Sequence, residues 1–206
     1  MKEAILCTNN PHKIEEVPQI LPMFRWVTLK DIGFHLDIPE DGKTFEENAS
    51  QKVTFVAQHR ERDGMLLVSD DSGLEVDILG KRPGVHSARY LGSDRDYVRK
   101  CEGILDELRG VAEADRTARF VCVVAVLLPS GNIKYFHGTC EGRIGFERRG
   151  EGGFGFDPIF LPAEYGYQKT MAELTPEEKH AISHRGKAFR AFAAWVEEEG
   201  KLYGIV

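Results

Sequence analysis

The sequence predicts a mixed α/β fold of the α+β kind, in which helices accompany one mixed β-sheet. Strand-like and helix-like segments are interspersed before residue 110, and two apolar runs joined by a turn fill residues 118–139. Amphipathic helices with clear start signals end the chain. No linker-like change of composition divides the 206 residues, so we expect one domain spanning residues 1–206.

The first three elements follow from an apolar run, a helix start and a second apolar run. Residues 3–8 and 26–29 predict strands on either side of a helix. Asn9 or Asn10 is expected to cap this helix, and Pro11 suits its first turn because the N–H that proline lacks has no partner there.

The next helix begins at the pattern Thr-Phe-Glu-Glu at 44–47, where Thr44 and Glu47 are expected to form a capping box. Lys52 lies near the middle of this helix. Apolar residues recur at helical spacing along one face, namely Phe45, Ala49, Val53, Val56 and Ala57.

Two adjacent carboxylates, Asp70 and Asp71, follow an apolar strand-like run at 65–69. Like charges repel, so the pair either ends the strand in solvent or faces a positively charged group. Residues 74–76 predict a continuation of the strand after a break.

The middle of the chain predicts a helix and a hairpin. Asp94 can cap a helix that Gly110 ends, and residues 118–128 and 133–139 predict two strands joined by the turn at 129–132. The apolar stripe expected on the helix is Tyr97, Val98, Cys101, Ile104, Leu105 and Leu108.

The last part of the chain predicts a loop and two helices. Residues 150–155 are rich in glycine, and Thr-Pro-Glu-Glu at 175–178 is a second capping box with proline at the first helical position. The buried stripe expected on the last helix is Ala188, Phe189, Phe192, Trp195 and Val196.

The composition limits where the protein acts and what it binds. A net charge of −6 disfavours binding to nucleic acid or to an anionic membrane, since both need an excess of basic residues. No apolar stretch approaches the roughly 18 residues of a membrane span. Four widely spaced cysteines are expected to be reduced, mostly buried thiols of a cytoplasmic protein, namely Cys7, Cys101, Cys122 and Cys140.

Two common nucleotide-binding patterns fail on inspection. Gly42-Lys43-Thr44 resembles the end of a P-loop, but Asp37 occupies the position of the required glycine. The glycines of 150–155 have the spacing of a dinucleotide fingerprint, but no helical pattern follows them. Residues 150–155 are therefore expected to form either a flexible turn or, in a functional role, a loop whose backbone closes on a ligand while Phe154 offers a flat face.

Several charged segments are each ordinary alone but chemically coherent together. Lys13 near a helix N-terminus suits an anion, and the acidic loop at 39–42 suits a cation. Mg²⁺ prefers a few carboxylates together with substrate phosphate oxygens, and it would neutralise the repulsion between Asp70 and Asp71.

Residues 69–90, SDDSGLEVDILGKRPGVHSARY, closely resemble the central motif of the inosine triphosphate pyrophosphatase family. Enzymes of this family hydrolyse non-standard purine nucleoside triphosphates. Four further blocks follow the family's order and spacing across nearly the whole chain, namely TNNPHK at 8–13, DGKTFEENA at 41–49, GGFGFDPIF at 152–160 and AELTPEEKHAISHRGK at 172–187.

The resemblance implies an elongated mixed sheet flanked by helices, two lobes with the active site in a cleft between them, and a homodimer. It also implies Mg²⁺-dependent cleavage of a nucleoside triphosphate to the monophosphate and pyrophosphate, by attack of water on the α-phosphorus. Inosine, deoxyinosine and xanthosine triphosphates (ITP, dITP and XTP) would be the preferred substrates.

The resemblance also assigns roles to residues. Asp71 matches the catalytic acid/base and possible Mg²⁺ ligand, Glu40 matches a metal ligand, and Asp70 is either a ligand or an orienting neighbour. The expected phosphate contacts are Thr8, Asn9, Asn10, Lys13, Lys52 and Ser72. The expected base-binding residues are Phe154, Gly155, Phe156, Asp157, Lys179, His184 and Arg185.

The selectivity for the base depends on which hydrogen-bonding groups the site presents to the edge of the purine. Phe154 is expected to stack on the base, and a donor such as Arg185 favours 6-oxo purines over adenine. Guanine shares the 6-oxo group, so its exclusion must arise at the 2-position. Phe156 stands where the family commonly has tyrosine, and His180 where asparagine is usual, which affects fine specificity and not the reaction class.

Two other readings remain open. The chain could be a pyrophosphatase of the distantly related septum-inhibitor family, acting on modified pyrimidine nucleotides. It could also be a non-catalytic nucleotide-binding protein, although such a protein is expected to lack acidic residues such as Glu40, Asp70 and Asp71.

Overall fold

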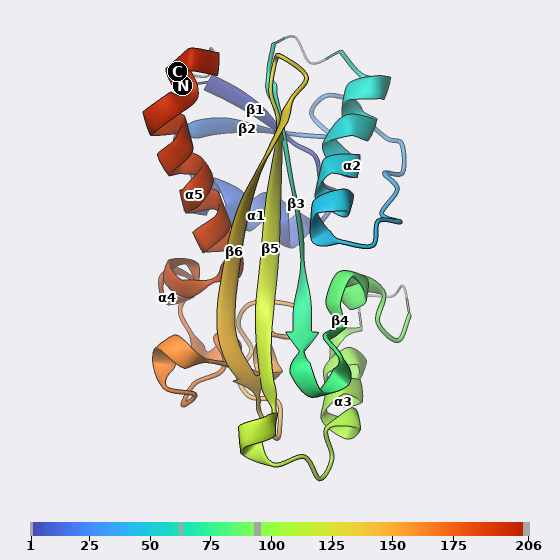
Figure 1. The fold of residues 1–206 in the computed structure, drawn as a ribbon, viewed down its shortest axis with the longest axis vertical. Coiled ribbons are helices and arrows are strands. Elements are labelled where there is room, and N and C mark those ends of the chain that lie inside the picture. The colour runs from blue at the N-terminus through green and yellow to red at the C-terminus, as the bar shows by residue number, and fades with distance from the viewer. Residues whose placement is uncertain (1, 62–63, 93–95, 204–206) are drawn as a thin grey trace. The chain divides into compact units, whose positions relative to one another are not determined.

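A computed structural model describes residues 2–61, 64–92 and 96–203 (Figure 1). The strands are β1 (Lys2–Leu6), β2 (Phe24–Thr28), β3 (Leu66–Val76), β4 (Arg82–Pro83), β5 (Thr117–Leu127), β6 (Ile133–Ile144) and β7 (Phe160–Pro162). The α-helices are α1 (Pro11–Ile20), α2 (Phe45–His59), α3 (Tyr97–Glu107), α4 (Pro176–Ile182) and α5 (His184–Glu199). Short 3₁₀ turns connect several of them.

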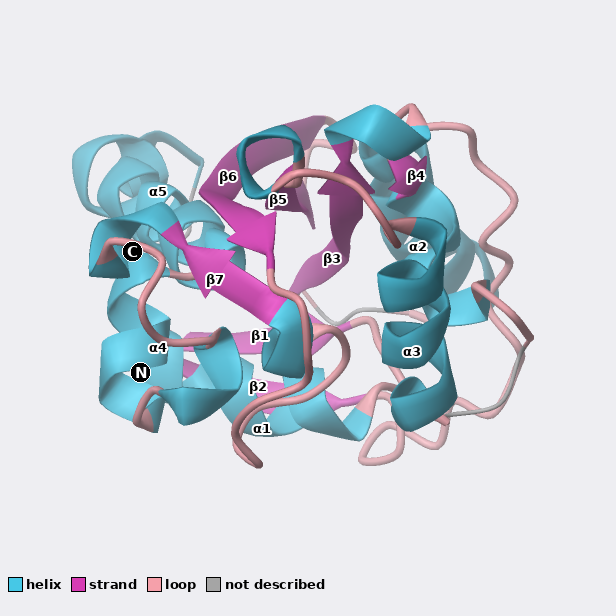
Figure 2. Cartoon of the chain, turned by 90° about the horizontal axis from the view of Figure 1, so that it is seen from below, coloured by secondary structure: helices cyan, strands magenta, loops and turns pink. Residues whose placement is uncertain are grey.

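The strands, drawn in magenta in Figure 2, form one sheet. Its strand order is β2-β1-β3-β5-β6-β7, with β4 paired to β3. β1 runs parallel to both β2 and β3, and Leu6 lies opposite Thr28 and Val68. β4 is antiparallel to β3, and β7 is antiparallel to β6. The sheet is therefore mixed, which confirms the predicted α/β fold class.

The backbone divides into two compact units, each assembled from separate segments of the chain. Unit 1 comprises residues 1–71, 122–138 and 186–206, and unit 2 comprises residues 72–121 and 139–185. β3, β5 and β6 each supply residues to both units. The division passes through strands instead of linkers, so composition could not reveal it.

The core of unit 1 lies between the sheet and the helices α1 and α5. Phe192 of α5 stacks on Phe24 of β2 with ring centroids 5.6 Å apart and nearly parallel planes. All five residues predicted for the stripe of the last helix are buried. In α2, four of the five predicted apolar residues are buried as well, the exception being the half-buried Ala57.

The core of unit 2 packs α3 against β5, β6 and the segment around Phe160. Cys101 and Ile104 of α3 and Leu108, which directly follows the helix, are buried as predicted. The inclusion of Val98 in this stripe was wrong, because its side chain is 52% exposed. Asp94 lies outside the described residues; Asp96 caps α3 by accepting a hydrogen bond from the backbone N–H of Arg99.

The helix starts agree with the sequence patterns in most details. Asn10 caps α1, and Thr44 caps α2 by accepting from the N–H of Glu47. The predicted capping box at Thr44 is incomplete, because the Glu47 carboxylate accepts from the N–H of Lys43 instead. The box at Thr175 has both of its hydrogen bonds.

The predicted break in the strand after Ser69 is wrong. β3 runs without interruption from Leu66 to Val76, and both aspartates lie within it and are buried. The strand continues because Lys13 and Lys52 both donate to the backbone carbonyl of Asp70 and also contact the carboxylates, so these charges need not reach water.

Two further features concern membranes and thiols. Among the described residues, no helix is long and apolar enough to cross a membrane. All four cysteines are buried free thiols, as predicted.

Candidate active site

Asp70 forms a buried ion pair in unit 1. Lys13 from the first turn of α1 places its Nζ 2.9 Å from Asp70 Oδ2 and 3.0 Å from the backbone oxygen of the same residue. Asp70 is fully buried, and its Oδ2 also accepts a weak hydrogen bond from the Cys122 thiol at 3.7 Å. The carboxylate of Asp70 therefore faces protein groups from two other elements.

Lys52 joins the other two acidic residues. Its Nζ lies 2.7 Å from Glu40 Oε1, 3.0 Å from Asp71 Oδ1 and 3.1 Å from the backbone oxygen of Asp70. Burial alone would lower the pKa of Lys52, but the attraction of Asp71 and Glu40 outweighs it and holds that pKa above its ordinary value. Lys52 therefore stays charged at every physiological pH.

The second oxygen of Asp71 is held by a residue that the sequence reasoning did not select. Asn48, one helical turn before Lys52 on α2, donates from Nδ2 to Asp71 Oδ2 at 3.0 Å. Its Oδ1 accepts from the N–H of Gly42 at 2.8 Å. Its place four residues before Lys52 was the available signal, because residues at that spacing share one face of a helix.

The residues before α1 form its capped N-terminus. Asn10 Oδ1 accepts from the N–H of His12 at 3.0 Å, and the N–H of Asn10 donates to Thr8 Oγ1 at 3.1 Å. Thr8 is buried and Asn9 is exposed. Lys13 therefore lies in the first turn of a helix whose N-terminus Asn10 caps, as the sequence predicted.

A second cluster, in unit 2, surrounds the ring of Phe154. Lys179 Nζ lies 4.7 Å from the ring centroid and Arg185 Cζ lies 5.4 Å from it, which are cation–π distances. Arg185 is almost completely buried and donates from Nη2 to Ser72 Oγ at 3.0 Å.

Asp157 fastens the loop that carries Phe154. Its Oδ2 accepts from the N–H of Phe154 at 2.9 Å and pairs with Lys179 Nζ at 2.8 Å. His184 stacks on Phe120, with ring centroids 4.8 Å apart. Arg185 is the next residue, so this stacking also holds the start of α5.

Phe156 and Gly155 lie on the core side of the same loop. Phe156 is 3% exposed and meets the edge of Tyr97 at 5.7 Å between centroids. The carbonyl of Gly155 accepts from the Cys101 thiol, and Gly155 has a positive φ of 69° that favours glycine. This packing explains why a phenyl ring without a hydroxyl group suits position 156.

The structure therefore groups the predicted site residues into two sets. The carboxylates and lysines, with the residues before α1, converge in unit 1, whereas Ser72 and the residues predicted to bind the base converge in unit 2. Among the described residues, no group of three or more histidine, cysteine, aspartate or glutamate side chains forms a ready-made metal site.

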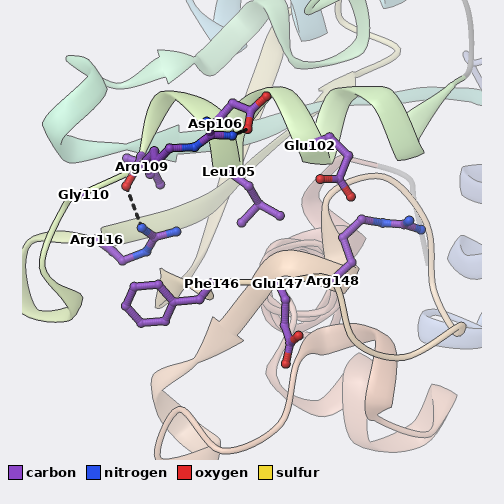
Figure 3. A pocket seen from close by; sticks show the side chains of 10 residues that line it. Glu102, Leu105, Asp106, Arg109, Gly110, Arg116, Phe146, Glu147 and Arg148 are labelled. Carbon is purple, nitrogen blue, oxygen red and sulfur yellow. Dashed lines mark hydrogen bonds and ion pairs between the residues drawn. The ribbon is translucent and has the colours of Figure 1, made fainter.

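A cavity of about 320 Å³ in unit 2 lies apart from this chemistry (Figure 3). Arg116 and Phe146 line it, with the guanidinium 4.4 Å from the ring centroid, and Asp106 pairs with Arg109 at its edge. Arg116 donates to the backbone oxygens of Leu108, Ile144 and Gly145. The residues that line this cavity include none of the predicted site residues, and Arg116 serves to fasten the backbone.

A helix N-terminus can bind a phosphate group, and Mg²⁺ is bound by carboxylates together with substrate phosphate oxygens. The sequence profile of the Ham1 family matches residues 4–195, and the chain belongs to this family. This confirms the family assignment that the sequence blocks indicated.

Relatives and solved structures agree with this assignment. The chain is 46% identical to a dITP/XTP pyrophosphatase of Bacillus subtilis, over 96% of this chain and 98% of the relative. It is also 46% identical to a dITP/XTP pyrophosphatase of Geobacillus kaustophilus, over 91% of each chain. The solved structure of the Ham1 protein of Staphylococcus aureus superimposes with a TM-score of 0.84 at 38% identity, covering 96% of this chain and all of that one.

Proposed function

We propose that this protein is a nucleoside-triphosphate pyrophosphatase that hydrolyses dITP, ITP and XTP to the monophosphate and pyrophosphate. The names of relatives that align over nearly the whole chain support this substrate class. The observation that carries the proposal is the placement of Asp71 against Lys52, beside Glu40 and the Lys13–Asp70 pair. These are the residues that the sequence resemblance selected.

The two buried lysines would bind the phosphates. Lys13 and Lys52 come from different helices, and both reach the same backbone carbonyl of Asp70. Glu40, Asp70 and Asp71 lie against these two lysines, and their carboxylates would repel a triphosphate. A divalent cation held jointly by carboxylates and phosphate oxygens would relieve this repulsion.

The carboxylates fit Mg²⁺. Oxygens of Glu40 and Asp71 already lie within 3.0 Å of one positive group, Lys52 Nζ, so both can face a common cation. Glu40 and Asp71 would hold the ion with phosphate oxygens and water completing its shell, and the ion would supply charge neutralisation at the phosphates. The full burial of Asp70 against Lys13 supports an orienting role for Asp70 in place of a ligand role.

Asp71 would act on the attacking water. Its carboxylate accepts the proton of the water as the water oxygen bonds to the α-phosphorus, and the bond from that phosphorus to the bridging oxygen breaks to release pyrophosphate. Lys13 and Lys52 stabilise the negative charge that develops on the leaving group.

The Phe154 cluster would bind the base. A purine can stack on Phe154, and Arg185 can donate to the 6-oxo group that hypoxanthine and xanthine share, whereas adenine offers a donor there. We further propose a cytoplasmic homodimer, and sedimentation analysis tests the dimer.

Pyrophosphate release from a panel of nucleoside triphosphates, with and without Mg²⁺, tests the function. We expect release from dITP, ITP and XTP only with Mg²⁺, and a fall in turnover of about 10²–10³-fold for Asp71→Asn. The matched control is Asp77→Asn, because Asp77 directly follows β3 but pairs with Arg119. Equal rates on ATP and dITP, or faster release from methylated pyrimidine triphosphates, would refute the proposal.

A further inference from the structure

We infer that Asn48 is a positioning residue that holds the Asp71 carboxylate and the acidic loop carrying Glu40 in one fixed arrangement. This inference rests on the proposed function, because it assigns Asn48 a part in the same site. The side chain is 1% exposed and lies on α2 between the loop and β3.

The orientation of the Asn48 amide is determined by its partners. The N–H of Gly42 can only donate, so Asn48 must present its oxygen to Gly42 at 2.8 Å. Its NH₂ group then necessarily faces Asp71 Oδ2 at 3.0 Å. One amide therefore ties the loop at Gly42 to the carboxylate of Asp71.

Two partners on one helix prevent the Asp71 carboxylate from rotating. Lys52 holds Oδ1, and Asn48, one turn earlier, holds Oδ2. The two partners differ in charge. When the Lys52 ammonium turns to a phosphate, the neutral Asn48 amide can stay on Asp71 and does not compete with a cation for it.

The loop approaches α2 so closely that its residue at position 42 must be small. A Cβ atom at Gly42 would lie 2.7 Å from Asn48 Oδ1 and 2.9 Å from the backbone nitrogen of Asn48. Glu40 lies two residues earlier and reaches Lys52. The Gly42–Asn48 contact therefore restricts the position of the Glu40 carboxylate relative to Asp71.

Gln51 provides a matched control on the same helix. Its amide makes the same kind of paired contact with the loop, donating to Asp41 Oδ1 and accepting from the N–H of Asp41 at 3.3 Å. These contacts hold the loop without holding Asp71. Tethering of the loop and orientation of Asp71 can thus be separated by substitution.

The experiment compares Asn48→Ala, Asn48→Asp and Gln51→Ala with the parent protein. For Asn48→Ala we expect kcat on dITP to fall about 10- to 100-fold with KM changed less than about threefold, because the residue acts through Asp71 and not on substrate. Titration of the nucleotide-free protein with Mn²⁺ alone, followed by electron paramagnetic resonance, should show affinity lowered about tenfold. Gln51→Ala should change kcat, KM and the Mn²⁺ affinity little.

Asn48→Asp keeps the shape of the side chain and the oxygen that accepts from the N–H of Gly42. It replaces the NH₂ group that faces Asp71 Oδ2 with a carboxylate oxygen. We expect the loss of kcat to match that of Asn48→Ala, and this variant carries the test if the alanine variant does not fold, which circular dichroism will show. Retention of kcat and Mn²⁺ affinity in the Asn48 variants would overturn the inference. An equal loss of kcat and Mn²⁺ affinity in Gln51→Ala would also overturn the inference, because tethering of the loop would then explain the effect without any contact to Asp71.

The two proposals can fail separately. If the parent protein releases no pyrophosphate from dITP, the proposed function fails. The Mn²⁺ titration then still decides whether Asn48 positions the two carboxylates, since it needs no substrate.

Discussion

Asp70 and Asp71 are neighbours in the chain, yet their carboxylates meet different partners. Successive side chains of a strand point to opposite faces, so β3 directs Asp70 to Lys13 and Cys122, and Asp71 to Lys52 and Asn48. The alternation separates the two charges, and each finds its own lysine. The repulsion that the sequence suggests is therefore relieved by the strand geometry and by the two cations together.

Removal of Lys13 should destabilise the fold. Lys13→Met leaves the fully buried Asp70 without its ammonium partner, and we expect the free energy of unfolding to fall by about 3–5 kcal/mol. Urea denaturation followed by tryptophan fluorescence measures this change. Arg25→Met is the control, since its ion pair with Glu3 is exposed and is expected to contribute about 1 kcal/mol or less. Equal losses in both variants would contradict the assignment of Lys13 and Asp70 as a buried pair.

At the scale of elements, the site depends on short irregular segments that capping and glycine residues hold in place. The capping box at Thr175 starts α4, a helix of seven residues that carries Lys179. The loop before β7 turns at Gly153, where φ is +67° and a Cβ atom would overlap the Asp157 carboxylate. The Phe154 cluster therefore depends on Gly153 having no side chain.

Gly153→Ala should impair substrate binding specifically. The added methyl group pushes Asp157 away from Lys179, so we expect KM for dITP to rise severalfold beyond any loss of stability. Gly131→Ala is the control, because Gly131 also has a positive φ, of +89°, but has open space around it. Both variants should lose about 1–2 kcal/mol from the strained backbone, and only the first should raise KM. Thermal melting and steady-state kinetics separate the two effects, and a normal KM in Gly153→Ala would contradict the role of the loop.

At the scale of the whole molecule, the two units share continuous strands. β3, β5 and β6 pass from one unit into the other, and their hydrogen bonds in the sheet link segments that are far apart in the chain. Loss of either unit would leave these strands with part of their partners missing. We therefore expect the units to unfold together.

Unfolding of the units can be followed separately. Trp26 and Trp195 lie in unit 1, whereas Cys101 and Cys140 lie in unit 2 and are buried. Burial raises the pKa of the Cys101 thiol to about 12, so it should react with a thiol reagent only after unfolding. We expect tryptophan fluorescence and labelling of these two cysteines to change at the same urea concentration. Labelling at lower urea, with fluorescence unchanged, would show that unit 2 unfolds alone.

The sequence alone determined the features that depend on neighbours within one or two helical turns. Asn10, Thr44 and Thr175 cap their helices as predicted, and the stripe on α5 is buried, because capping and amphipathic patterns are local properties. The motif blocks likewise identified the family. Most candidate residues also came from these blocks, since each block carries its own functional side chains.

The tertiary structure decided what depends on contacts between distant segments. The continuity of β3 through two aspartates required Lys13, which lies 57 residues before Asp70 in the chain. The link from Asn48 to Asp71 spans 23 residues, and the division into two units passes through strands. Such contacts form only when helices pack on a sheet, so no local pattern records them, and they explain why buried charges can occupy the middle of a strand.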